Sequence, residues 1–111
     1  MSPIRDKWVL ITGASSGFGA AAGRAFAAQG SKLLLGARRL ERLEQVAAEA
    51  RQAGAPEAHF HALDVSKTSS VDAFVNWARQ IIAPRQPAGA RLDVLINNAG
   101  GAHGLDPVAQ G

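Results

Sequence analysis

Apolar residues follow two alternating patterns along this chain: short runs and longer stretches with helical spacing. The short runs, which predict strands, span residues 8–11, 33–35, 59–63 and 92–96. The longer stretches, in which apolar residues recur at steps of three and four, span residues 17–29, 40–51 and 71–82 and predict helices. In the second of these, Arg42 and Glu49 occupy the polar face, so that helix should lie at the surface.

The segments between these stretches carry boundary signals. We expect Ser66, Thr68 or Ser69 to cap the third helix. Residues 81–91 contain two prolines and a glycine and predict a loop. Gly23, inside the first helix, costs roughly 1 kcal/mol relative to alanine, which a close contact between helix and sheet would explain.

The alternation of strands and helices places the chain in the α/β class. Each expected helix is long enough to cross over between strands, so the strands should be parallel and the connections right-handed. A Rossmann-type doubly wound parallel sheet fits this order, and that fold has two such halves. We expect residues 1–111 to form the first β-α-β-α-β-α-β half only, the N-terminal part of such a domain.

The composition excludes several classes of protein. Of the 111 residues, 47% are hydrophobic and 19% are charged, which is typical of a globular protein. No apolar run approaches the ~20 residues of a membrane span, and residues 1–7 lack the apolar core of a secretion signal. Cysteine is absent, which excludes disulfides and thiolate metal sites. The net charge of +3 is weak evidence for nucleic-acid binding, so we expect neither nucleic acid nor membrane as a partner.

The stretch T-G-A-S-S-G-F-G joins the first expected strand to the first expected helix. Such a turn points free backbone N–H groups and the positive end of the helix dipole at one spot, which attracts a phosphate. Gly13 would permit the tight turn, Gly17 would let a pyrophosphate approach, and Gly19 would let the helix pack close to the sheet. Ser15 and Ser16 would add hydroxyl donors. The alternative is a tight connection that binds nothing.

Two further motifs follow later strands. A D-V pair lies at residues 64–65 and an N-N-A-G stretch at residues 97–100. Together with the T-G-x-x-x-G-x-G turn, they make residues 7–105 resemble the short-chain dehydrogenase/reductase family. The resemblance implies a Rossmann sheet and an enzyme that uses NAD(H) or NADP(H) to interconvert alcohols and carbonyls.

The resemblance also assigns residues to the cofactor. Asp64 would accept a hydrogen bond from the adenine amino group, with Val65 offering a backbone contact. Asn98 would lie beside the cofactor ribose, and Gly100 would let the backbone pass close to it. Asp64 could instead cap the third helix, and we expect Asn97 to stabilise the end of the sheet. The cofactor-binding set is Gly13, Ala14, Ser15, Ser16, Gly17, Phe18, Gly19, Arg38, Arg39, Asp64, Val65, Asn98, Ala99 and Gly100.

The end of the second expected strand indicates the choice of cofactor. Enzymes that use NAD place an acidic residue there for the ribose 2′-hydroxyl, whereas an arginine suits the 2′-phosphate of NADP. This chain has Ala37 at that position, followed by Arg38 and Arg39, whose guanidinium groups can bind phosphate. The alternative is that both arginines are solvated at the start of a helix, where the dipole disfavours them. We therefore expect NADP(H) rather than NAD(H).

The family's catalytic Tyr-x-x-x-Lys pair is missing, because the chain contains no tyrosine. We expect no catalytic residue here and no activity from this part alone. His59 and His61 alternate on one strand face without a third ligand, so we expect no metal site. The leading hypothesis is the NADP(H)-binding part of a short-chain oxidoreductase, truncated before its catalytic half. The alternatives are a non-catalytic nucleotide-binding or redox-sensing module and an inert truncation product.

Substrate and setting are indicated by resemblance alone. The G-F-G turn, the R-R-L-E-R-L stretch and residues 100–107 resemble the branch that acts on 3-hydroxy acids such as serine or allo-threonine. We expect the full enzyme to act on a small-molecule substrate, to form a homo-oligomer and to work in the cytoplasm.

Overall fold

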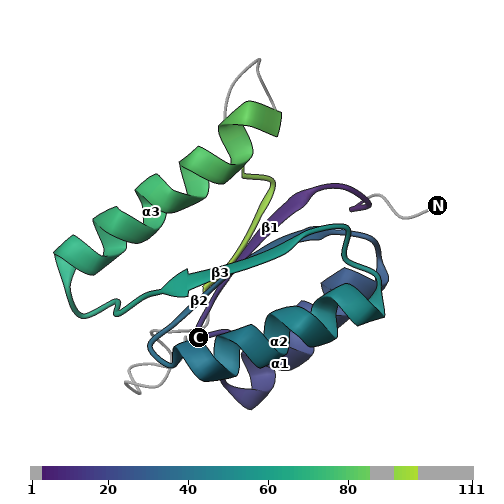
Figure 1. The fold of residues 1–111 in the computed structure, drawn as a ribbon, viewed down its shortest axis with the longest axis horizontal. Coiled ribbons are helices and arrows are strands. Elements are labelled where there is room, and N and C mark those ends of the chain that lie inside the picture. The colour runs from purple at the N-terminus through teal and green to yellow at the C-terminus, as the bar shows by residue number, and fades with distance from the viewer. Residues whose placement is uncertain (1–3, 86–91, 98–111) are drawn as a thin grey trace.

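The computed structural model describes residues 4–85 and 92–97, and its helices and strands alternate (Figure 1). The elements are β1 (Trp8–Thr12), α1 (Gly17–Ala28), β2 (Lys32–Ala37), α2 (Leu40–Ala53), β3 (Ala58–Ala62), α3 (Thr68–Ile82), the short 3-10 helix η1 (Ala83–Arg85) and β4 (Val94–Asn97). The predicted order of strands and helices is confirmed. None of these helices is long and apolar enough to cross a bilayer.

The strands form one parallel sheet in the order β3-β2-β1-β4. β1 is central, since Ile11 pairs with Leu35 of β2 on one side and with Ile96 of β4 on the other. Because the strands all run in the same direction, their carboxyl ends lie along one edge of the sheet, where α/β folds bind their ligands. The predicted Rossmann-like half is therefore confirmed.

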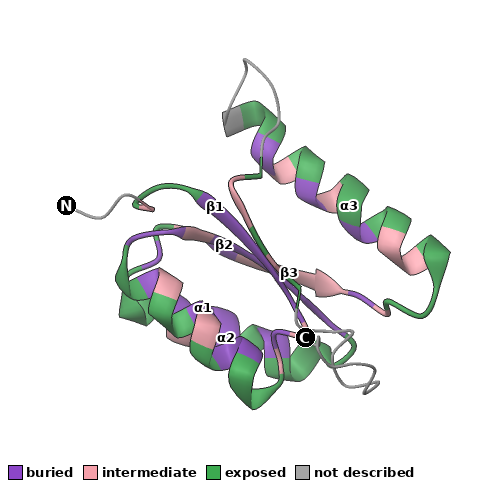
Figure 2. Cartoon of the chain, turned by 180° about the vertical axis from the view of Figure 1, so that it is seen from behind, coloured by how far each residue is buried: buried purple, intermediate pink, exposed green. Residues whose placement is uncertain are grey.

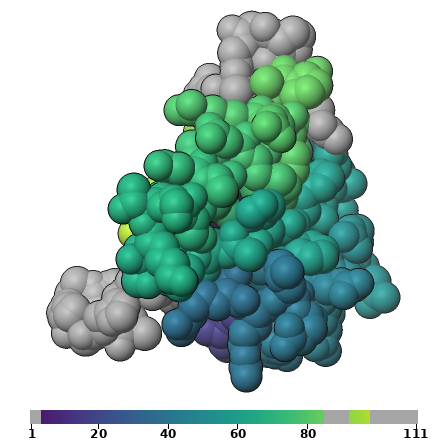
Figure 3. Space-filling model, turned by 60° about the vertical axis from the view of Figure 1, so that its left-hand side comes forward, coloured from purple at the N-terminus to yellow at the C-terminus, as the bar shows by residue number. Residues whose placement is uncertain are grey.

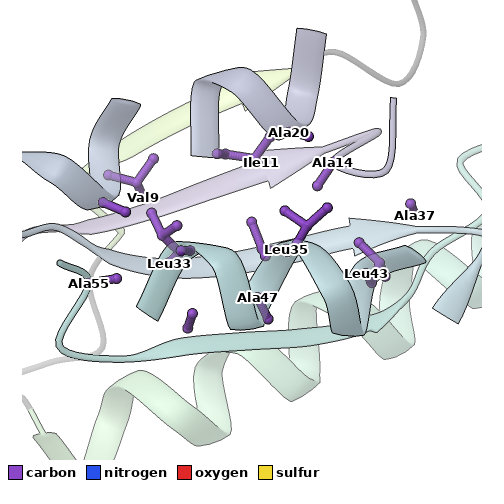
Figure 4. Close-up of a cluster of buried hydrophobic side chains, with 14 residues drawn as sticks. Val9, Ile11, Ala14, Ala20, Leu33, Leu35, Ala37, Leu43, Ala47 and Ala55 are labelled. Carbon is purple, nitrogen blue, oxygen red and sulfur yellow. The ribbon is translucent and has the colours of Figure 1, made fainter. Parts of the chain in front are cut away.

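Helices cover both faces of the sheet: α1 and α2 lie on one face and α3 on the other (Figures 1 and 2). Alternate residues of β1 point to opposite faces of the sheet. Val9 and Ile11 pack in the cluster under α1 and α2, which Figure 4 shows. Trp8 and Leu10 pack in the cluster under α3. All of β1 is buried, as predicted for a strand covered on both sides.

β2 is longer than its apolar run predicts. It continues through Gly36 and Ala37, and both residues are buried. A Cβ at Gly36 would lie 2.6 Å from the ring of Phe74 and 3.0 Å from Leu63. The strand needs glycine at this position because Phe74 and Leu63, which pack under α3, occupy the space that a side chain would take.

The predicted cap of α3 is wrong. Its N-cap residue is Lys67, which makes no side-chain capping bond. The hydroxyl of Ser66 instead donates to the Asp64 carboxylate, and the N–H of Asp64 donates to the hydroxyl of Ser70. The polar side chains in this segment therefore stabilise the loop before the helix.

The close contact expected at Gly23 is also absent. A Cβ there would lie 3.9 Å from atoms of Ile11, Leu33 and Val46, an ordinary van der Waals distance. The helix therefore has room for a methyl group at this position.

Candidate cofactor-binding site

The glycine turn between β1 and α1 is held by backbone hydrogen bonds. Gly13 has a φ of 63°, in the left-handed region that favours glycine. Its carbonyl accepts from the N–H of Ser16 at 3.1 Å and from the hydroxyl of Ser16 at 2.9 Å. The N–H of Ala14 donates to the Gly36 carbonyl at 3.1 Å. The turn is therefore anchored to β2.

The first turn of α1 leaves backbone donors open. The hydroxyl of Ser16 accepts from the N–H of Gly19 at 3.1 Å, and the carbonyl of Ser16 accepts from the N–H of Ala20 at 2.8 Å. Among the described residues, the N–H groups of Gly17 and Phe18 have no hydrogen-bond partner. Two free donors at the positive end of a helix can bind an anion. The Ser16 hydroxyl donates to the Gly13 carbonyl and caps the helix, so its proton lies within the turn in this structure.

The glycines of the turn differ in their surroundings. Nothing lies within 4 Å of a Cβ built at Gly17, so this side of the turn is open. A Cβ at Gly19 would collide with the Gly13 carbonyl oxygen and lie 2.9 Å from the Cα of Ala14. Gly19 therefore allows α1 to approach the turn itself, rather than the sheet as predicted. The side chain of Phe18 is 73% exposed beside the open donors.

Arginines gather beside this turn, where β2 leads into α2. Arg38 leaves the strand, Arg39 is the N-cap residue of α2, and Arg42 lies in its first turn; all three are exposed. In the part of the chain that the structure describes, none of them forms an ion pair with a carboxylate. One guanidinium N–H of Arg42 donates to the carbonyl of Ser15 at 3.4 Å. Positive charge thus lies next to the free N–H groups.

Asp64 follows β3 at the same edge of the sheet. Its Oδ1 accepts from the hydroxyl of Ser66 at 2.6 Å and from the N–H of Ser66 at 3.0 Å. These hydrogen bonds hold the pKa of the Asp64 carboxyl below its usual value, helped by the charges of Lys67 and Arg38 and opposed by burial. Since Lys67 is the N-cap residue of α3, the alternative that Asp64 caps this helix is wrong. The carboxylate stays charged near Arg38 at neutral pH.

Most of the predicted site residues lie at the edge of the sheet where the parallel strands end. The Thr12 hydroxyl donates to Oδ1 of Asn97 at 3.1 Å and joins the ends of β1 and β4, as expected for Asn97. Asn98, Ala99 and Gly100 lie outside the described residues. The predicted site residues that lie in the turn or at the carboxyl ends of β2 and β3 are Gly13, Ala14, Ser15, Ser16, Gly17, Phe18, Gly19, Arg38, Arg39, Asp64 and Val65.

The two histidines of β3 contact aromatic rings. His59 stacks on Trp8, and its Nε2 lies 2.8 Å from Oε1 of Glu57. The ring of His61 lies 5.1 Å from that of Trp77. The described ranges contain no group of three side chains that could hold a metal ion. Packing against rings accounts for both histidines.

Comparison with known sequences tests the family resemblance. The short chain dehydrogenase family profile matches residues 7–110. The chain belongs to this family. An uncharacterized oxidoreductase of Staphylococcus saprophyticus is 40% identical to it over 100 residues, which are 90% of this chain and 37% of that protein. This short-chain dehydrogenase chain thus spans about a third of the length of that curated relative.

Solved structures agree with the fold of this short-chain dehydrogenase chain. An alcohol dehydrogenase from the archaeon Thermococcus sibiricus, complexed with 5-hydroxy-NADP, is similar with a TM-score of 0.66 and 42% identity. The match covers 80% of this chain and 35% of that one. L-sorbose reductase from Gluconobacter frateurii, complexed with NADPH and L-sorbose, gives a TM-score of 0.76 and 34% identity over 87% of this chain and 34% of that one.

One residue beside the turn was not predicted to belong to the site. The sequence places Arg42 on the polar face of a surface helix, which is correct. Its contact with Ser15 joins residues 27 positions apart and has no signature in local periodicity. The available signal was its place in the sequence, four residues after Arg38 and at the start of the predicted second helix.

Proposed function

We propose that this chain is the NADP(H)-binding part of a short-chain oxidoreductase that interconverts an alcohol and a carbonyl. The observation that carries the proposal is the open start of α1, whose free N–H groups follow a turn that an exposed arginine, Arg42, contacts at the carboxyl edge of the sheet. A dinucleotide phosphate has the charge and acceptor oxygens that such a place recognises.

The residues present fit this cofactor. The N–H groups of Gly17 and Phe18 would bind the pyrophosphate, and the empty space at Gly17 leaves room for it. In the described chain, Oδ2 of Asp64 has no hydrogen-bond partner and could accept from the adenine amino group. Asn98 and Gly100 are assigned to the ribose by the family resemblance.

The choice of NADP(H) over NAD(H) rests on the end of β2. Ala37 is buried and offers no carboxylate for a ribose 2′-hydroxyl. Arg38 follows it, exposed and unpaired with any described carboxylate, and its planar fork suits a 2′-phosphate. Arg39 adds a second charge. Both features favour the phosphorylated cofactor.

The bound nicotinamide would supply or accept the hydride. This chain's own residues would bind and orient the cofactor, since its sequence has no tyrosine to serve as the family's proton donor. For the full-length protein that contains this chain, we propose a small-molecule alcohol or carbonyl as the substrate, with a 3-hydroxy acid as the first class to test. A homo-oligomer in the cytoplasm is part of the same proposal.

Replacement of Arg38 tests the cofactor assignment. In the full-length protein, Arg38→Ala should weaken NADPH binding by about ten- to a hundredfold, because a charge-assisted hydrogen bond to the 2′-phosphate is lost. NADH affinity should change little. Fluorescence titration with each cofactor measures the two dissociation constants.

Arg79→Ala is the matched control, because it removes an exposed arginine from the last turn of α3. It should leave both affinities unchanged. Equal losses for NADPH and NADH in Arg38→Ala would contradict the assignment of Arg38 to the 2′-phosphate.

A further inference from the structure

We infer that Arg42 is a positioning residue that holds the glycine turn in its cofactor-binding shape from the neighbouring helix α2. The inference rests on the proposed function, because the turn is the proposed pyrophosphate site. It concerns a contact within the protein, whereas binding of the 2′-phosphate is assigned to Arg38.

The guanidinium of Arg42 is held at two points. Its Nη2 donates to the carbonyl of Ser15 at 3.4 Å, and its Nη1 donates to Oε1 of Gln45 at 3.4 Å. Gln45 lies one turn further along the same helix. A planar fork with two N–H groups can bridge two such acceptors, whereas a single ammonium cannot reproduce this geometry. Arg42 therefore connects α2 to the turn.

The contact fixes one peptide unit of the turn at both ends. The carbonyl of Ser15 and the N–H of Ser16 belong to the same planar peptide. The N–H donates to the Gly13 carbonyl at 3.1 Å, and Arg42 is the one donor to the Ser15 carbonyl among the described residues. The next N–H groups along the chain are the free donors of Gly17 and Phe18. The direction of the Ser15–Ser16 peptide thus helps to set where these donors point.

The surface around this contact combines two parts of the chain. In Figure 3 a blue region of the surface borders a small purple patch of the N-terminal part of the chain. Both bonds of Arg42 are long and exposed, so each is weak. We therefore expect a moderate effect on affinity that applies to both cofactors, since NADH and NADPH share the pyrophosphate.

The test compares two variants with the unaltered full-length protein. Arg42→Ala should weaken NADH and NADPH binding by the same factor, about three- to tenfold, because one modest hydrogen bond is lost. Arg42→Lys should give a smaller loss of the same kind. In the cofactor-free protein, the amide of Ser16, whose N–H donates to the Gly13 carbonyl, should exchange hydrogen faster in Arg42→Ala. Arg79→Ala should change none of these quantities.

Gln45→Ala gives an independent measurement. It removes the acceptor of Nη1 and leaves the charge in place, so it should reproduce part of the Arg42→Ala effect on both cofactors. A loss of NADPH affinity alone in Arg42→Ala would overturn the inference and make Arg42 a reader of the 2′-phosphate. Unchanged affinities and unchanged exchange would overturn it as well.

Failure of the proposed function looks different. If the unaltered protein bound neither cofactor, or if Arg38→Ala reduced both affinities equally, the NADP(H) assignment would fall. Amide exchange in the cofactor-free protein would still show whether Arg42 holds the turn. The two proposals can thus be rejected separately.

Discussion

Gly36 shows at the residue scale how a missing side chain determines packing. A Cβ at Gly36 would lie 2.6 Å from the nearest ring atom of Phe74, which is too close for an ordinary contact. Phe74 is only 2% exposed, so its ring has little room to move away. Gly23 lies in a helix with ordinary room around it, its nearest atoms 3.9 Å away. The same change, glycine to alanine, should therefore have opposite effects at these two positions.

Gly36→Ala should lower the free energy of unfolding by about 1–3 kcal/mol, because Phe74 must leave its packed position. Gly23→Ala should raise it by about 0.5–1 kcal/mol, because alanine loses less backbone entropy than glycine on helix formation. Urea unfolding of the full-length protein measures both. Destabilisation by both variants would mean that α1 packs more tightly than described.

Asp64 gives a pH-dependent prediction. Its pKa in the folded protein lies below the usual 3.8, mainly because Ser66 donates two hydrogen bonds to the charged carboxylate. Folding therefore favours the ionised form: this stabilisation is fully present above pH 3.8 and is lost as the pH falls through the lower, folded pKa. Ser66→Ala removes the hydroxyl donor and should raise the pKa of Asp64 towards its usual value.

An NMR titration of the Asp64 carboxyl measures this pKa in each variant. Ser69→Ala is the control, since Ser69 is exposed in the same segment and makes no described side-chain bond. It should leave the titration unchanged. An unaltered pKa in Ser66→Ala would show that the hydroxyl bond does not cause the shift and leave the backbone N–H and the charges of Lys67 and Arg38 as its causes.

At the scale of the elements, the spacing of apolar residues predicted those strands and helices whose position depends on a buried face. β1 and the three helices followed from their apolar residues, because a buried face must be apolar at the spacing of its element. The end of β2 could not be predicted in this way, because Gly36 is buried but has no apolar side chain that would indicate burial. Nor could the first turn of α3, because the Ser66 hydroxyl donates to the Asp64 carboxylate instead of capping the helix.

The candidate site shows the same division. The sequence located the glycine turn, Arg38 and Asp64, because each directly follows a strand and parallel strands end at one edge. It did not reveal that the Ser16 hydroxyl is used within the turn, or that Arg42 reaches the Ser15 carbonyl. Such contacts depend on how α1 and α2 are placed relative to one another, which local patterns do not encode.

At the scale of the whole molecule, the two faces of the sheet are covered unequally. Val94 and Ile96 of β4 pack against the α1 and α2 side. Leu95 pairs in register with Leu10, whose side chain lies on the α3 side, yet Leu95 is 58% exposed. α3 therefore leaves the end of this face over β4 open to solvent in the described structure.

The chain of 111 residues, expressed by itself, should accordingly self-associate. An apolar strand at an open sheet edge favours pairing with other copies. We expect weak NADPH binding, no dehydrogenase activity and a broad thermal transition. Size-exclusion chromatography with light scattering measures the association, and Leu95→Lys should reduce it.

Phe60→Lys on β3, at the other edge of the sheet, is the comparison for Leu95→Lys. Phe60 packs against the core, so its replacement should cost stability without removing the β4 patch. A monomer that unfolds sharply and reversibly and binds NADPH tightly would instead favour the non-catalytic nucleotide-binding module.

The pairing of β1 with β4 also bears on how the chain comes together during synthesis. The backbone N–H of Trp8 donates to Oδ2 of Asp93, 85 positions away in the sequence, and Val9 pairs with Val94. β2 reaches its position beside β1 much earlier, since Trp8 pairs with Lys32. Closing the longer loop carries the larger entropy cost, and the N-terminal part leaves the ribosome first. The nascent protein should therefore assemble β1, β2 and α1 before β4 is synthesised. Until then, the side of β1 that pairs with β4 has no neighbouring strand.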